Sequence, residues 1–227
     1  MAVRNDRRRE EILKAAYELL AEKGYRMAAL SEIAAKSGIN KSLLQHYYPA
    51  KSDIIKAMFA ELLEVSFSYI ENTSEKKDDF MQGISDFNMF FFKALEYDYQ
   101  LKQFMTVSIS RPEVLEIWIE IICEWLRKYC GENTFSWLQV RTAIGYSMTG
   151  SMYLFLHEDE LGIDYRMFCR RHMVSILEML GYNSGRINEI ISSTEVNIMK
   201  MDVDDYLSWC RSQICWMAQE DSPEPAL

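Results

Sequence analysis

The sequence predicts an all-α fold, with a unit of three short helices at its start and a larger helical domain after it. Residues 10–60 contain three segments whose apolar residues recur at helical spacing, and very short connections join them. The chain of 227 residues has only 4 prolines and 9 glycines, which leaves few breaks for strand turns. Because 49% of the residues are hydrophobic, a chain of this length can bury a large core.

The first two helical segments are expected to end at Gly24 and Gly38. Glycine suits the left-handed backbone conformation that often follows the end of a helix. After the bend at residues 38–40, Asn40 can cap a third helix that runs from Lys41 to about Tyr47. Two short helices joined by a tight bend predict a helix-turn-helix.

The chain beyond residue 50 predicts further helices and no strand. A long helix over about 51–69 is expected to link two domains, a helix-turn-helix domain over 1–50 and a helical domain over 51–219. The remaining helices of the second domain are expected at about 78–95, 101–108, 112–130, 135–157, 164–180, 184–199 and 202–218. The tail 220–227 is acidic and holds two prolines, a composition typical of disorder.

Several parts of the first domain, all in register, resemble the DNA-binding domain of the TetR (tetracycline-repressor) family of transcriptional regulators. They are Gly24-Tyr25, Ser31-Glu32-Ile33-Ala34, Gly38-Ile39-Asn40-Lys41 and Leu44-Gln45-His46-Tyr47-Tyr48-Pro49-Ala50-Lys51. The resemblance implies a cytoplasmic homodimeric repressor with a helical domain for effector binding and dimerisation. Such a protein would bind a pseudo-palindromic double-stranded DNA operator and be released by a small apolar or aromatic effector.

The distribution of charge favours contact with DNA at one end of the protein. Residues 1–60 hold 11 Lys and Arg against 7 Asp and Glu, a net charge of +4, whereas the remaining residues hold 14 against 27, a net charge of −13. A basic unit on an acidic body can approach phosphates with one end only. Arg4, Arg7, Arg8 and Arg9 are either a solvated terminus or an arm that lies along DNA.

Six residues are the candidate DNA contacts. A major groove admits one helix, and side chains near the N-terminus of that helix reach the base edges, which favours Lys41, Ser42, Gln45 and His46. The resemblance implies that Tyr47 and Lys51 bind phosphates. The alternative for each is an exposed polar side chain without a DNA partner.

Three residues depart from the family pattern. Ala29 stands where Thr is common, Ala50 where Ser or Asn is common, and Gln45 where Tyr is common. Alanine has no side-chain oxygen to cap a helix, which predicts a loss of roughly 0.5–2 kcal/mol of helix stabilisation at each start. We expect an altered operator or weaker DNA binding as a result.

The helices over 135–157 and 164–180 are the candidate dimer interface. The first has a stripe of small side chains that permits close helix approach, and the resemblance implies that this pair forms a four-helix interface between two subunits. The predicted interface residues are Ala143, Ser147, Gly150, Ser151, Phe168, His172 and Ile176. The alternative is an ordinary core within one chain.

Wide, adaptable side chains in the second domain predict a pocket for a flat or apolar effector, because aromatic rings and methionines bury apolar area without demanding one shape. The candidate lining residues are Phe87, Phe91, Phe104, Met105, Trp118, Trp125, Tyr146 and Met148. A filled core is the alternative for each of them.

Competing functional classes have less support. The three histidines complete no metal-binding or catalytic motif, and no phosphate loop or nucleophile motif is present, so we expect neither an enzyme nor a metal or cofactor site. Five cysteines without a C-x-x-C pair indicate a reduced protein, and the absence of an apolar run of about 20 residues predicts no membrane partner. A helical adaptor or sensor with a decayed, non-DNA-binding helix-turn-helix remains the alternative, because Ala29 and Ala50 are unusual there. The two C-terminal helices extend past the family pattern and have no assigned role.

Overall fold

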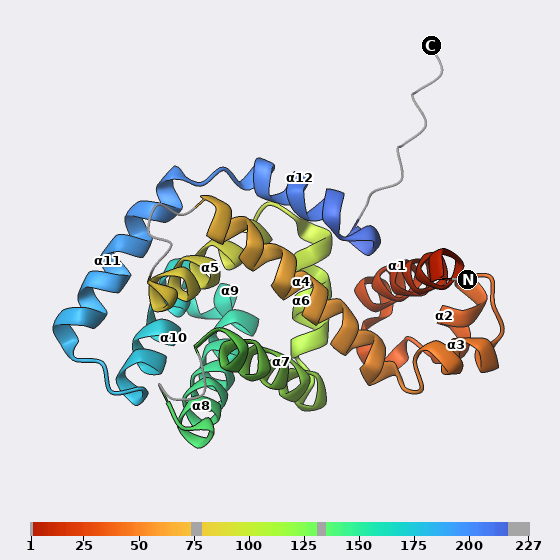
Figure 1. Ribbon diagram of the computed structural model, residues 1–227, viewed down its shortest axis with the longest axis horizontal. Coiled ribbons are helices and arrows are strands. Elements are labelled where there is room, and N and C mark those ends of the chain that lie inside the picture. Colours follow the sequence, from red (N-terminus) through yellow and green to blue (C-terminus); the bar gives the residue numbers. More distant parts are fainter. Residues whose placement is uncertain (1, 74–78, 131–134, 218–227) are drawn as a thin grey trace, which may run out of the picture.

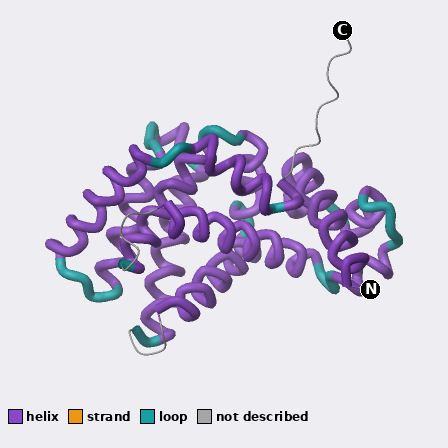
Figure 2. The backbone as a smooth tube through the Cα atoms, turned by 45° about the horizontal axis from the view of Figure 1, so that its top comes forward, coloured by secondary structure: helices purple, strands orange, loops and turns teal. Residues whose placement is uncertain are grey.

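The computed structural model describes residues 2–73, 79–130 and 135–217, which form twelve α-helices, one short 3₁₀ helix and no strand (Figures 1 and 2). The helices are α1 (Ala2–Met27), α2 (Leu30–Lys36), α3 (Lys41–Tyr47), α4 (Lys51–Thr73), α5 (Phe80–Leu95), α6 (Tyr99–Ile109), α7 (Pro112–Cys130), α8 (Trp137–Leu156), α9 (Glu158–Leu161), α10 (Tyr165–Met179), α11 (Ser184–Lys200), α12 (Val203–Gln213) and the 3₁₀ helix η1 (Cys215–Met217). The all-α prediction is confirmed. The predicted tail 220–227 lies outside the described residues.

Helices α1, α2 and α3 form a small unit at one end of the molecule (Figure 1). Gly24 interrupts α1 with a φ of 76°, and Gly38 turns the chain between α2 and α3 with a φ of 68°. Both angles lie in the left-handed region that favours glycine, as the sequence predicted. Leu20, Ile33 and Leu44, one from each helix, are fully buried and hold the unit together.

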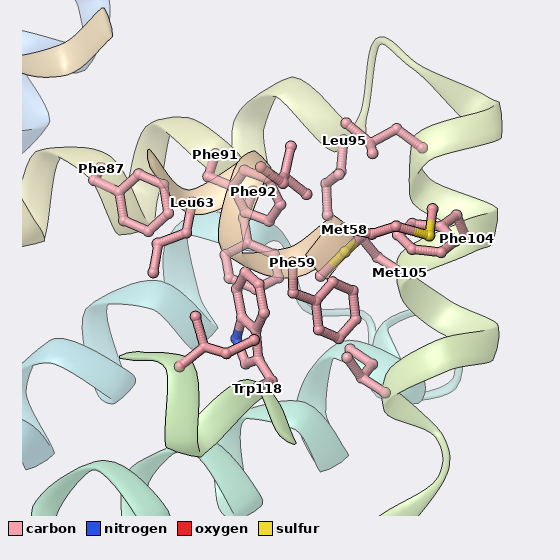
Figure 3. Packing of buried hydrophobic residues seen from close by; sticks show 14 of the residues in the cluster. Met58, Phe59, Leu63, Phe87, Phe91, Phe92, Leu95, Phe104, Met105 and Trp118 are labelled. Carbon is pink, nitrogen blue, oxygen red and sulfur yellow. The ribbon is translucent and has the colours of Figure 1, made fainter. Parts of the chain in front are cut away.

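Helix α4 belongs to the cores of both the small unit and the larger body. Its first turns pack on α1, and the rest of the helix packs on α5, α7 and α12. Figure 3 shows Met58, Phe59 and Leu63 of α4 among side chains from α5, α6 and α7. One continuous hydrophobic core therefore runs from the small unit through α4 into the larger body.

The larger body is built around α5. Helix α10 packs on α8 and α5, and α11 packs on α5 and α10. The chain then turns, and α12 runs back across α4 toward α1 (Figure 1).

A buried polar cluster fixes α11 on α5. The Gln82 amide donates to Asp86 Oδ1 and to Thr194 Oγ1, each at 2.8 Å, and Asn197 Nδ2 donates to Asp86 Oδ2 at 2.8 Å. Burial raises the pKa of the Asp86 carboxyl, and these donors oppose that effect. The hydrogen bonds satisfy a carboxylate that has no exposed surface.

Candidate nucleic-acid interface and apolar cavity

The outer face of α3 is polar and open to solvent. The exposed residues of this face include the four predicted base contacts, Lys41, Ser42, Gln45 and His46. Leu44, on the opposite side of the helix, is fully buried. The Asn40 side chain accepts a hydrogen bond from the Leu43 N–H at 2.8 Å, which confirms the predicted cap. A short capped helix with a polar outer face suits entry into a major groove.

Tyr47 and Lys51, the two predicted phosphate contacts, differ in their availability. Tyr47 is half-buried, and its ring meets the His46 ring edge-on at 5.8 Å. The Lys51 ammonium instead binds inside the small unit. It donates to the carbonyl oxygens of Tyr25 and Ala28, the latter at 2.7 Å, and lies 4.4 Å from the centre of the Tyr25 ring.

Burial lowers the pKa of Lys51, and a charge on Glu113 opposes that effect. The two hydrogen bonds to Tyr25 and Ala28 use two of the three ammonium donors of Lys51. They join the start of α4 to the end of α1 and the residue that follows it. One donor of Lys51 thus remains for a phosphate, and the predicted phosphate contact stays a prediction.

Acidic side chains replace part of the missing caps at Ala29 and Ala50. Glu32 Oε2 accepts from the Ala29 N–H at 3.0 Å, and Asp53 Oδ2 accepts from the Ala50 N–H at 2.8 Å. In a capping box, the N-cap side chain accepts from the N3 backbone N–H, and the N3 side chain accepts from the N-cap backbone N–H. Glu32 and Asp53 each make the second of these hydrogen bonds, which requires no side-chain oxygen at the N-cap. Lys23 binds Glu32 at 2.9 Å, and this hydrogen bond and the Ala29 N–H lower the pKa of Glu32. The two departures therefore leave the helix starts partly capped.

An apolar cavity of about 410 Å³ lies in the larger body, between α5, α7, α8, α10 and Phe135. The only charged residue in its described lining is Arg127, whose guanidinium carbon lies 5.8 Å from the centre of the Trp137 ring. The lining residues are Met81, Ile84, Leu126, Arg127, Phe135, Trp137, Val140, Ile144, Ile176 and Leu180. A cavity of this size and lining fits a small, mostly apolar ligand.

None of the eight predicted pocket residues lines this cavity. Five of them fill the core around α4, where Figure 3 shows Phe87, Phe91, Phe104, Met105 and Trp118 packed together. Of the other three, Trp125 packs on Phe67 of α4, Met148 is buried and Tyr146 is 70% exposed. The rings and thioethers of the buried members pack as a filled core, the alternative named for them, and the cavity lies beside other residues. A pocket on the predicted side chains stays a prediction.

The predicted dimer residues lie mostly within the protomer. Their helices α8 and α10 pack against each other, and Ser147 Oγ donates to Ser175 Oγ at 3.0 Å across that contact. The six buried residues are Ala143, Ser147, Ser151, Phe168, His172 and Ile176. Only Gly150 is exposed, with open space where a Cβ would stand. The buried members of the small-residue stripe thus lie within one protomer, where α8 packs on α10.

The outward faces of the same two helices expose large apolar side chains. Leu138, Tyr146 and Tyr153 of α8 are 75%, 70% and 57% exposed, and they follow one another at helical spacing. Met167 of α10 is 44% exposed. An exposed apolar stripe of this kind is typical of a surface that meets another protein.

Burial favours the neutral forms of the described thiols and of His172 in the larger body. Burial raises the pKa of all four described thiols, to about 11 for Cys123 and Cys210 and about 12 for Cys215, with Cys169 also well above its usual value. Burial lowers the pKa of His172 to about 4. These thiols are protonated at neutral pH and therefore unreactive. Among the described residues there is no cluster of three metal-ligating side chains, and no helix is long and apolar enough to cross a membrane.

Comparisons with known proteins agree with the geometry of the small unit. Residues 12–58 match the family model for bacterial regulatory proteins of the tetR family. The transcriptional repressor KstR2 of Mycolicibacterium smegmatis is 21% identical over 131 residues, which cover 52% of this chain and 64% of the relative. The transcriptional activator FasR of the same organism is 27% identical over 95 residues, 42% of this chain and 43% of the relative. The matches thus span about two fifths to just under two thirds of these relatives.

The arrangement of the helices over most of the chain also has a known counterpart. The crystal structure of RolR in complex with resorcinol aligns with a TM-score of 0.57 at 18% sequence identity, and the alignment covers 85% of this chain and 96% of that chain. At this identity, the similarity shows a shared fold.

Proposed function

Since this chain belongs to the TetR family of bacterial regulatory proteins, we propose that it is a cytoplasmic, ligand-responsive transcriptional repressor that binds a DNA operator as a homodimer. The observation that carries this proposal is the exposed polar face of α3. Lys41 and Gln45 carry donors that suit guanine and adenine edges, and Ser42 and His46 lie beside them. Tyr47 binds phosphate from the end of the same helix, and the third Lys51 donor adds at most one such contact.

The dimer forms through the outward faces of α8 and α10. Tyr146 and Tyr153 of one subunit meet the same surface of the second subunit across a two-fold axis. Gly150 lies on the same exposed face, where the absence of a side chain lets the two α8 helices approach closely. This interface keeps the predicted helix pair and replaces six of its seven predicted residues.

The apolar cavity is the effector site, and α7 links it to α4. Leu126 and Arg127 of α7 line the cavity, and the neighbouring Trp125 packs edge-on against Phe67 of α4 with 4.1 Å between the ring centres. An occupant that displaces α7 therefore displaces α4, and α4 moves the small DNA-binding unit. Because the charged lining residue is Arg127, neutral or anionic aromatic compounds are better ligands than cationic ones.

Selection of bound sequences from random double-stranded DNA tests the proposal directly. The expected product is a pseudo-palindrome whose half-sites lie about one helical turn, about 34–36 Å, apart. Binding no stronger than to non-specific competitor DNA would reject the repressor proposal and favour the adaptor with a decayed helix-turn-helix. Loss of the chain in its host should raise transcription from promoters that contain the selected sequence.

A further inference from the structure

The C-terminal segment of the described chain returns to the junction between the DNA-binding unit and the larger body. Helix α12 crosses α4, and η1 packs against α1 (Figure 1). We call residues 203–217 the C-terminal strap. Ile214 and Trp216 are at most 1% exposed, so the end of the strap is embedded in the junction.

Trp216 completes a cluster of three rings from three different elements. Its ring centre lies 4.9 Å from that of Tyr17 in α1 and 5.8 Å from that of Phe104 in α6. Tyr17 and Phe104 also meet edge-on at 5.2 Å. Aromatic pairs at these separations attract one another beyond the effect of area burial.

Polar contacts hold the strap at both ends. At the junction, the Trp216 indole N–H donates to Glu61 Oε2 of α4 at 2.7 Å. Arg211 of α12 binds Asp98, the N-cap residue of α6, at 2.7 Å. Farther along α4, the hydroxyl groups of Ser66 and Tyr206 are 2.7 Å apart. The strap therefore contacts α1, α4 and α6 together.

We propose that the C-terminal strap positions the DNA-binding unit, with Trp216 as the wedge that fixes the angle of α1 against α4 and α6. This inference rests on the proposed function, because the fixed angle sets the distance between the two recognition helices of a dimer. A rigid junction makes the protein sensitive to operator half-site spacing, and a loosened junction makes it tolerant.

The test uses the full-length protein and three variants. Trp216→Ala removes the wedge, and Trp216→Phe keeps a ring but removes the indole donor, which provides a milder change if Trp216→Ala does not fold. Trp209→Ala is the matched control, because Trp209 lies in the same segment but is 37% exposed. Each protein is measured on the selected operator and on the same operator with two base pairs added between its half-sites.

The first readout is the ratio of the dissociation constants on these two operators. The ratio is the dissociation constant on the lengthened operator divided by that on the selected operator. We expect both Trp216 variants to lower this ratio, Trp216→Ala by about fivefold or more. Trp209→Ala should leave it unchanged. An unchanged ratio in Trp216→Ala, or an equal fall in Trp209→Ala, would overturn the proposal.

The second readout is hydrogen exchange without DNA, which separates positioning from general stability. Amides of α1 around Tyr17 should exchange about tenfold faster or more in Trp216→Ala, while those of α10 keep their protection. Equal acceleration in α1 and α10 would mean global destabilisation and would reject a positioning role. If the unmodified protein binds no operator, the repressor proposal fails, and this exchange pattern alone decides whether the strap holds α1.

Discussion

At Lys51 the same ammonium can serve a phosphate or the protein, and the contacts to Tyr25 and Ala28 favour the protein. Lys51→Met keeps the length of the side chain and removes the charge. We expect the free energy of unfolding to fall by about 1–3 kcal/mol, because two carbonyl groups lose their donor. Chemical denaturation followed by circular dichroism measures this change.

Lys41→Met is the matched control for that experiment. Lys41 is exposed at the start of α3, so its substitution should change the free energy of unfolding by no more than about 0.5 kcal/mol. It should nevertheless weaken DNA binding. A Lys51→Met protein of unchanged stability, whose DNA affinity depends less steeply on salt, would show that Lys51 binds phosphate after all.

Gln45 is the side chain best suited to distinguish one base from another. Its amide can donate to and accept from an adenine edge, so Gln45→Ala should remove the preference at one position of each half-site, worth about 1–3 kcal/mol. Competition binding with operators changed at single positions measures this preference. A uniform loss of affinity for all of these operators would exclude Gln45 from base recognition.

The sequence could predict residues whose roles depend on local structure. Asn40 caps α3 and the glycines at 24 and 38 adopt positive φ, because each role depends only on neighbouring backbone. The role of Lys51 depends on carbonyl groups more than 20 residues earlier in the chain. A sequence motif that places a lysine at this position therefore does not determine whether the ammonium binds a phosphate or a backbone carbonyl.

At the scale of elements, the outward faces of α8 and α10 predict how the protein dimerises. Tyr146→Asp places a charge within the proposed interface, so we expect a folded monomer. Light scattering measures the mass. Tyr97→Asp is the control, because Tyr97 is also a largely exposed tyrosine, 64% against 70%, and lies between α5 and α6.

A dimer of unchanged mass in Tyr146→Asp would place the interface elsewhere. Ser147→Leu should behave differently from both variants. Its side chain lies inside the α8–α10 contact, so a larger residue overpacks the protomer and lowers the melting temperature.

We expect His172 to make the contact between α8 and α10 sensitive to acid. Its folded pKa of about 4 is below the ordinary value of 6.5, so the unfolded chain binds the proton more readily. The contribution of His172 to stability is therefore complete above pH 6.5 and falls as the pH drops toward 4, by up to about 1.4 kcal/mol per pH unit. Denaturation of the protein and of His172→Met across this range should show a shallower fall in the variant. Parallel curves would contradict a buried neutral imidazole.

Helical periodicity could predict the elements and their apolar faces but not the partner of each face. The small side chains of Ala143, Ser147 and Ser151 permit close helix approach, yet the helix that approaches in this structure is α10 of the same chain. In the same way, the sequence shows that Phe104 and Trp118 are wide apolar side chains, but the contacts that make them part of a filled core come from elements distant in sequence.

At the scale of the whole molecule, the proposed mechanism connects the cavity to α3 through α7 and α4. Ile144 and Ile176 line the cavity from α8 and α10, so Ile144→Trp should fill part of it and reduce the thermal shift caused by a bound compound. Screening neutral, anionic and cationic aromatic compounds by thermal shift identifies a ligand. The cationic compounds serve as the controls, because Arg127 lies in the lining.

The thermodynamic coupling between ligand binding and operator binding then tests whether that ligand is the effector. A ligand that weakens operator binding through α7 and α4 must itself bind more weakly to the DNA-bound protein, by the same factor. A coupling free energy of about 1–3 kcal/mol, or about 5–150-fold, is the expected range for such a switch. Titration of the ligand with and without operator measures the factor directly. Equal ligand affinity in both titrations would mean that occupation of the cavity does not move the DNA-binding unit, however tightly the ligand binds.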